Sequence, residues 1–200
     1  MVSVKGRCRR SAKKGRYHEA PQQVGKTVTQ KHLSHGQDLS ALRILLVDDD
    51  AALRGAVVAI LRALGAKEVI EAPNGKAALE IISTNPPDFI ISDWEMAPMN
   101  GAELLAAVRD QSNEPTCFLP IIILTAHARP TLIRHAVSLG ASQLLVKPVS
   151  PERLLSQIRW VLADSRQFYL EEGKYRLPMP GQEPSTEQPV ADNDSDIAWV

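Results

Sequence analysis

The chain has little of what a cysteine-based site or framework needs. Its 200 residues include two cysteines, Cys8 and Cys117, which lie far apart and have no second cysteine or histidine at metal-ligand spacing. This pattern excludes a disulfide framework and gives no sign of a zinc site. Because Cys117 adjoins Phe118 and Leu119, we expect it to be a small buried hydrophobic residue.

Long hydrophobic runs are also missing. No uninterrupted stretch is able to span a bilayer, and no apolar segment of signal-peptide length follows Arg9 and Arg10 near the start. We therefore expect no membrane insertion and a cytoplasmic location.

The chain as a whole carries no net charge, because 23 basic residues balance 23 acidic ones. Its two ends, however, are oppositely charged. Residues 1–40 carry nine Lys or Arg against two acidic residues, whereas the segment from Asp164 onward carries eight acidic and three basic residues. Neither end has regular hydrophobic periodicity. We predict a basic disordered arm at 1–40, one folded domain at 41–164, and an acidic, Pro-rich, mostly disordered tail at 165–200.

The two ends carry weak signals of their own. The basic arm has no aromatic interleaving beyond Tyr17, so nucleic-acid binding is not expected. In the tail, Phe168–Leu170 with Tyr175 and Leu177 is locally apolar and able to dock on the folded domain or on a partner. The segment after Ala163 is too short and polar for a helix-turn-helix, so we expect no direct transcriptional control.

The central part alternates apolar strands with amphipathic helices. The strands are expected at residues 43–47, 68–71, 89–92, 120–124 and 143–146, and the helices at 53–64, 77–82, 102–109, 130–139 and 151–164. Strict alternation with apolar strands predicts a parallel sheet with helices on both faces. The predicted fold class is α/β: a doubly wound, three-layer αβα sandwich whose five strands have the flavodoxin-like order 2-1-3-4-5.

Four of the five expected strands end in a chemically useful residue. Asp48 and Asp49 follow the first strand, Asp93 the third, Thr125 the fourth and Lys147 the fifth. The carboxyl ends of parallel strands meet at one edge of the sheet, so these side chains should converge there. Each alone has an ordinary explanation, such as a helix cap or an exposed lysine, but their coincidence indicates a site.

Three converging carboxylates repel one another and therefore require a hard divalent cation, for which oxygen ligands favour Mg2+. Asp49 and Asp93 are the expected direct ligands. A magnesium ion that keeps several waters leaves room for phosphoryl oxygens, and Lys147 and Thr125 are able to hold the others. The set therefore indicates transfer of a phosphoryl group to a carboxylate.

These motifs resemble the CheY-like receiver domain of response regulators, over about Leu42 to Leu162. The resemblance rests on an apolar run with Asp-Asp, Asp93-Trp-x-Met with Gly101 eight positions on, Ile-Leu-Thr-Ala, and Leu-Val-Lys-Pro. It implies that Asp93 is the phosphoacceptor and that Asp48, Asp49 and the backbone carbonyl of Glu95 hold Mg2+. It also implies that Thr125 is the switch hydroxyl, that Lys147 contacts the phosphoryl group, and that the Lys147–Pro148 bond is cis.

The sequence departs from that family at two positions. Pro98 stands one place later than the family's usual proline, where this chain has Ala97, so the loop after Asp93 is expected to differ in shape. Leu144 occupies the place where many members have a Tyr or Phe that turns inward with the switch threonine. Signalling is therefore expected to run mainly through Ala126 and the loop beside it.

Two loop residues border the path by which water reaches an acyl phosphate. Glu95 lies two residues after the acceptor Asp93, and His127 lies two after Thr125. We hypothesise that Glu95 and His127 set the phosphoryl lifetime. The alternative is that both are solvated loop residues without such a role.

The resemblance implies a stand-alone response regulator of the two-component phosphorelay. Its expected partners are a histidine kinase or phosphotransfer protein, a downstream protein target, and a second copy in a phosphorylation-dependent dimer. A different class of function is an Mg2+-dependent phosphohydrolase with Asp93 as nucleophile, although such enzymes have the nucleophile after the first strand. A nucleotide- or flavin-binding domain is disfavoured because the first turn, Asp48-Asp-Asp-Ala-Ala, lacks a Gly-rich phosphate cradle.

Overall fold

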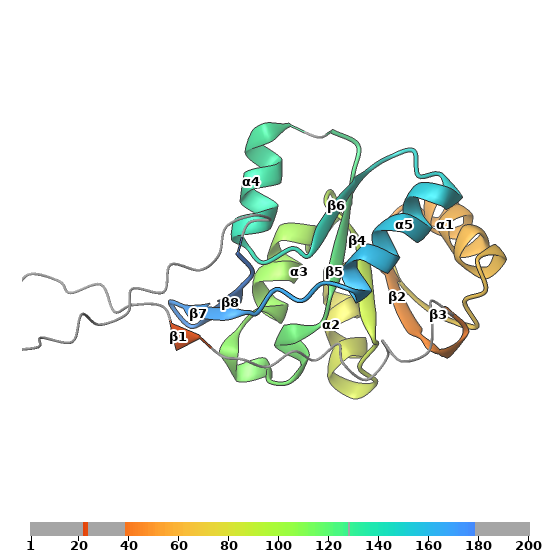
Figure 1. The fold of residues 1–200 in the computed structure, drawn as a ribbon. Helices are drawn as coiled ribbons and strands as arrows, with labels where there is room; N and C mark the ends of the chain where they lie inside the picture. The colour runs from red at the N-terminus through yellow and green to blue at the C-terminus, as the bar shows by residue number, and fades with distance from the viewer. Residues whose placement is uncertain (1–21, 24–38, 128, 179–200) are drawn as a thin grey trace, which may run out of the picture.

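The structure is a computed structural model that describes residues 22–23, 39–127 and 129–178. Its centre is a parallel sheet of five strands in the order β3-β2-β4-β5-β6 (Figure 1). The strands are β2 (Arg43–Val47), β3 (Glu68–Ala72), β4 (Phe89–Asp93), β5 (Ile121–Thr125) and β6 (Gln143–Val146). Numbered within the sheet, this is the predicted order 2-1-3-4-5, and the predicted fold class is confirmed.

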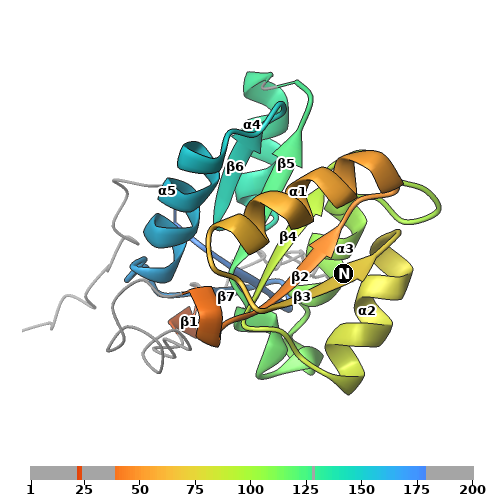
Figure 2. The same cartoon turned by 90° about the vertical axis from the view of Figure 1, so that its right-hand side faces the viewer.

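Five helices alternate with these strands: α1 (Ala51–Ala63), α2 (Gly75–Thr84), α3 (Gly101–Val108), α4 (Pro130–Ser138) and α5 (Pro151–Leu162). Three short 3-10 turns, η2 (Leu39–Ala41), η3 (Gln111–Asn113) and η4 (Thr116–Phe118), complete the connections. Helices α1 and α5 cover the face of the sheet seen in Figure 2, and α2, α3 and α4 cover the other. The strands β4 and β5 are buried along their whole length, as expected of a sheet covered on both sides.

Local residues fix where several helices begin and end. The Asp50 side chain accepts hydrogen bonds from the backbone N–H groups of Ala52 and Leu53 and so caps the start of α1. Asn100 and Glu103 form a reciprocal capping box at the start of α3. Gly140 follows α4 with φ of 89°, a conformation that glycine adopts without steric cost. These caps place the loops that carry the functional residues.

The folded part of the chain does not end at Asp164. Residues beyond α5 form a hairpin of β7 (Tyr169–Glu171) and β8 (Lys174–Arg176), and β7 also pairs with β1 (Gln22–Gln23). The hairpin lies beside α3 and α4 in Figure 1. The predicted boundary at 164/165 is therefore corrected: the described residues up to Pro178 belong to the folded part, because Phe168, Tyr175 and Leu177 are buried against the domain. The predicted disorder of the remaining arm and tail concerns residues 1–21, 24–38 and 179–200, which lie outside the described residues.

Candidate functional site

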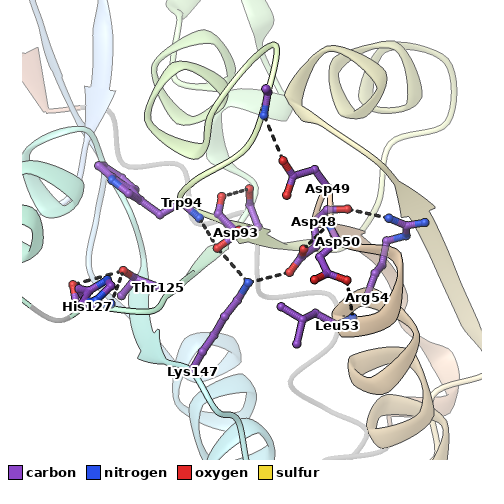
Figure 3. Close-up of polar contacts among 12 residues, drawn as sticks. Asp48, Asp49, Asp50, Leu53, Arg54, Asp93, Trp94, Thr125, His127 and Lys147 are labelled. Carbon is purple, nitrogen blue, oxygen red and sulfur yellow. Dashed lines mark hydrogen bonds and ion pairs between the residues drawn. The ribbon is translucent and has the colours of Figure 1, made fainter.

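The carboxyl ends of four strands bring the predicted residues to one edge of the sheet (Figure 3). Asp48 and Asp49 directly follow β2, Asp93 ends β4, and Thr125 ends β5. Lys147 follows β6 and reaches toward Asp48 and Asp93 (Figure 3). The three aspartates offer carboxylate oxygens that all lie within 4.8 Å of one another. Residues that are far apart in the sequence thus form one cluster.

Lys147 connects two of the three carboxylates. Its Nζ lies 2.8 Å from Oδ2 of Asp48 and 3.1 Å from Oδ1 of Asp93. Burial by itself lowers the pKa of Lys147, but the hydrogen bonds and negative charges of Asp48 and Asp93 outweigh it and raise the pKa above its ordinary value. The ammonium group therefore remains charged, and its contacts with Asp48 and Asp93 fix its position. The peptide bond between Lys147 and Pro148 is cis, as the resemblance implied.

Asp93 is buried at the end of a fully buried strand. Burial raises the pKa of its carboxyl above the ordinary value, although the Lys147 ammonium and the backbone N–H of Trp94 act in the opposite direction. The Trp94 N–H donates to Oδ1 at 2.8 Å and so orients the carboxylate. Gly101 passes so close behind that a Cβ there would lie 2.3 Å from the backbone oxygen of Asp93. The close contact between the two backbones explains why position 101, eight residues after Asp93, is occupied by a residue without a side chain.

The other two aspartates have unequal surroundings. Asp48 is buried, and while one of its oxygens contacts Lys147, the other accepts a hydrogen bond from the backbone N–H of Asp50. Asp49 is exposed and accepts from the N–H of Ala97 at 3.3 Å. A proline at position 97, the usual place in the family, would have no N–H to donate. The shifted proline therefore leaves this loop with a contact to the acidic pair.

The donor set fits a divalent metal ion. Three carboxylates share the pocket with one ammonium group, so two negative charges remain uncompensated within the cluster. Oxygen-only ligands of this kind suit hard cations such as Mg2+. The pocket of Asp48, Asp49 and Asp93 is compatible with such an ion, and Glu95, the fourth predicted contributor, lies exposed two residues after Asp93.

Thr125 is buried, and its hydroxyl is bonded to the next loop. Its Oγ1 accepts from the backbone N–H of His127 at 3.1 Å and donates to the His127 carbonyl at 3.3 Å. The Ala126 and His127 side chains are exposed. Leu144 is half-buried on the side of the sheet that α2, α3 and α4 cover. The predicted signalling and lifetime roles of these residues stay predictions.

The structure also reveals contacts that the sequence analysis missed. The indole ring of Trp94 meets the imidazole of His135 on α4 edge to face, with ring centroids 5.6 Å apart. Arg54 donates to the backbone carbonyl of Asp48 at 2.7 Å and pairs with Glu71, which supports the acidic turn from α1. The Asp-Trp pair was visible as a motif, but its helical partner, 41 residues away, carried no signal in the sequence.

Comparison with known proteins agrees with this geometry. The sequence model of the response regulator receiver domain family matches residues 44–159 of this chain. The chain is 35% identical over 117 residues to the chemotaxis protein CheY of Pseudomonas aeruginosa, a match that covers 58% of this chain and 93% of that protein. It is also similar to the solved structure of the chemotaxis protein CheY4 of Vibrio cholerae, with 38% identity, a TM-score of 0.55, and coverage of 60% of this chain and 97% of that one. Within the described residues, none of the helices is both long enough and apolar enough to cross a membrane.

Proposed function

Because the chain belongs to the response regulator receiver domain family, we propose that it accepts a phosphoryl group on Asp93 and acts as a protein switch. Receiver domains of this CheY-like type serve two-component signalling and are signalling proteins rather than conventional enzymes. The observation that carries the proposal is the pairing of Asp93 with Lys147 beside the acidic residues Asp48 and Asp49. A buried carboxylate with a fixed ammonium at 3.1 Å is suited to become an acyl phosphate.

Each residue of the site has a separate role in the proposed phosphorylation. A carboxylate oxygen of Asp93 attacks the phosphorus of a phosphohistidine, the new O–P bond forms, and the N–P bond breaks with its electron pair going to the imidazole. The ammonium of Lys147 lies beside the attacking group and balances charge on the phosphoryl oxygens. The Thr125 hydroxyl donates to one of those oxygens after leaving His127. Mg2+ held by Asp48, Asp49, Asp93 and the Glu95 carbonyl would supply further charge neutralisation.

The phosphoryl donor is proposed to be a histidine kinase or a histidine phosphotransfer protein, and the output is a contact with another protein. Phosphorylation then shifts a two-state equilibrium, because the product differs from the free carboxylate in charge and in hydrogen-bonding capacity. A phosphorylation-dependent homodimer, a cytoplasmic location, and the control of phosphoryl lifetime by Glu95 and His127 are further parts of this proposal.

The direct test is phosphorylation with acetyl phosphate and Mg2+. We expect wild-type protein to gain one acid-stable, hydroxylamine-sensitive phosphoryl group, and Asp93→Asn to gain none. An Asp110→Asn variant is a matched control, since Asp110 is an aspartate outside the cluster. Equal labelling of Asp93→Asn would refute the assignment. Sustained hydrolysis of stable phosphomonoesters, at a rate that depends on Asp93, would instead support the phosphohydrolase alternative.

A further inference from the structure

Three arginines hold the turn that connects α4 to β6. Each guanidinium donates to a different backbone carbonyl, at the last residue of α4 or in the turn after it: Arg176 to Ser138 at 2.5 Å, Arg109 to Gly140 at 2.9 Å, and Arg166 to Ser142 at 3.0 Å. We call this arrangement the carbonyl clamp. Two of its arginines, Arg166 and Arg176, lie in residues 164–178, which we call the C-terminal extension. The extension therefore binds the end of α4 and the turn after it through side-chain hydrogen bonds, which are separate from the backbone hydrogen bonds of the central sheet.

The extension also covers the third arginine. The Phe168 ring lies 4.8 Å from the guanidinium carbon of Arg109, which is completely buried. Backbone hydrogen bonds join the β7–β8 hairpin to the residues that follow α3, from Tyr175 N–H to the Arg109 carbonyl and from Gln111 N–H to the Gly173 carbonyl. The extension is thus docked on the receiver by side chains and by main chain.

A small apolar cluster lies beneath the extension. Phe168, Tyr175 and Leu177 pack with Cys117 and Phe118 of the receiver, and all five side chains are buried. The Phe118 ring contacts both aromatic rings, at centroid distances of 5.5 Å to Phe168 and 4.6 Å to Tyr175. Undocking of the extension would therefore expose Cys117, whose thiol reports on this cluster.

The last turn of α4 lies between this clamp and the phosphorylation site. His135 contacts the indole ring of Trp94, whose backbone N–H is bonded to the Asp93 carboxylate. Ser138, three residues after His135, is held by Arg176. One helical turn thus touches both the residue next to the phosphoacceptor and the C-terminal extension. A displacement of this turn would alter both contacts together.

We propose that phosphorylation of Asp93 loosens the docked C-terminal extension by displacing the last turn of α4, an inference that rests on the proposed function. The Thr125 hydroxyl donates to the His127 carbonyl, and it must give up that bond to donate to a phosphoryl oxygen. His127 lies three residues before the start of α4 at Pro130. The carbonyl clamp holds the other end of α4 and so favours the arrangement with the Thr125–His127 bonds. Phosphorylation and docking of the extension therefore oppose each other.

The coupling is measured by the reactivity of Cys117 in the full chain. Because the chain has two cysteines, a Cys8→Ser background leaves Cys117 as the single thiol. Its rate of reaction with a thiol reagent is followed before and after phosphorylation by acetyl phosphate and Mg2+, while the phosphoryl content of Asp93 is measured separately. We expect the rate to rise by about fivefold or more, the lower end of ordinary couplings between sites.

Substitution of His135 separates coupling from simple packing. In His135→Ala we expect normal phosphorylation and normal basal reactivity of Cys117, but loss of most of the increase on phosphorylation. Arg134→Ala is the matched control, because Arg134 is an exposed neighbour on the same helix. Arg176→Gln, which opens the carbonyl clamp, is expected to raise the basal reactivity and leave a smaller increase.

The outcomes keep the two proposals apart. A phosphorylated protein with unchanged Cys117 reactivity would overturn the coupling and leave the proposed function standing. Retention of the full increase in His135→Ala would likewise overturn the coupling alone. Failure to phosphorylate Asp93 at all would instead reject the proposed function together with the coupling built on it.

Discussion

Replacement of Arg109 by methionine tests how much the buried guanidinium beneath the extension stabilises the folded chain. The Arg109 guanidinium is completely buried and donates to the carbonyls of Cys117, Leu119 and Gly140 at 2.7 to 2.9 Å. Methionine fills similar space but donates no hydrogen bond. Leaving three buried carbonyls without these donors costs about 3–9 kcal/mol at about 1–3 kcal/mol for each. Loss of the cation–π contact with Phe168 adds about 1–2 kcal/mol.

Removal of a buried cation offsets part of that loss. Among the described residues Arg109 forms no salt bridge, and its Nη2 has no hydrogen-bond partner. Burial lowers the pKa of Arg109 to about 9, so the group is still protonated at neutral pH, and its desolvation costs several kcal/mol. The net expectation is a loss of about 3–5 kcal/mol, because the carbonyls left without donors outweigh the removal of the buried cation.

Urea unfolding, followed by circular dichroism at pH 7, measures this difference. The matched control is Arg62→Met, because Arg62 is exposed at the end of α1 and its replacement should change stability by no more than about 0.5 kcal/mol. If Arg109→Met unfolds within about 1 kcal/mol of wild type, the three carbonyls are satisfied in some other way. The stabilising role of the buried Arg109 hydrogen bonds would then be refuted.

Three further variants examine separate parts of the molecule. A Glu95→Ala/His127→Ala double variant should change the decay rate of the acyl phosphate, and an unchanged rate in a phosphate-release assay would reject their role in its lifetime. Gly101→Ala should cost about 1–3 kcal/mol in thermal unfolding, because the new Cβ meets backbone at 2.3 Å, and an unchanged midpoint would contradict that clash. The hydrogen bond with Glu114 raises the pKa of Tyr175 to about 12, so Tyr175 contributes stability that is present below pH ~10 and lost as pH rises through about 12. Tyr175→Phe should therefore remove the highest transition in an absorbance titration of the tyrosines, and its persistence would exclude this assignment.

The fold and the convergence of the site were predictable because each depends on short local patterns. Apolar strands that stop abruptly at Asp48, Asp93, Thr125 and Lys147 indicate both the strand ends and the side chains found there. A parallel sheet then brings these residues together whatever the details of packing. The N-cap at Asp50 is a local feature of the same kind, since a cap is decided within one turn of helix.

The C-terminal extension was not predictable in the same way. The sequence marks Phe168, Tyr175 and Leu177 as locally apolar, but so short a segment, with charged residues on both sides, does not show whether it docks on the domain or on a partner. Arg109 at the end of a helix resembles an exposed residue, and only the folded chain brings carbonyls and an aromatic ring around it. Contacts of this kind depend on tertiary packing between segments that are distant in sequence.

Leu144 and Trp94 together bear on how the signal leaves the site. A leucine at position 144 has no ring to rotate inward, so that route from Thr125 toward β6 is missing from this chain. The indole of Trp94 provides a different aromatic contact, directly from the residue after the acceptor to His135 on α4. That contact lies on α4 rather than on β6, and the end of α4 is the part that the carbonyl clamp holds. The absence of an aromatic ring at position 144 and the presence of a clamped helix beside Trp94 are therefore the observations that favour α4 as the element through which the proposed phosphorylation would be read.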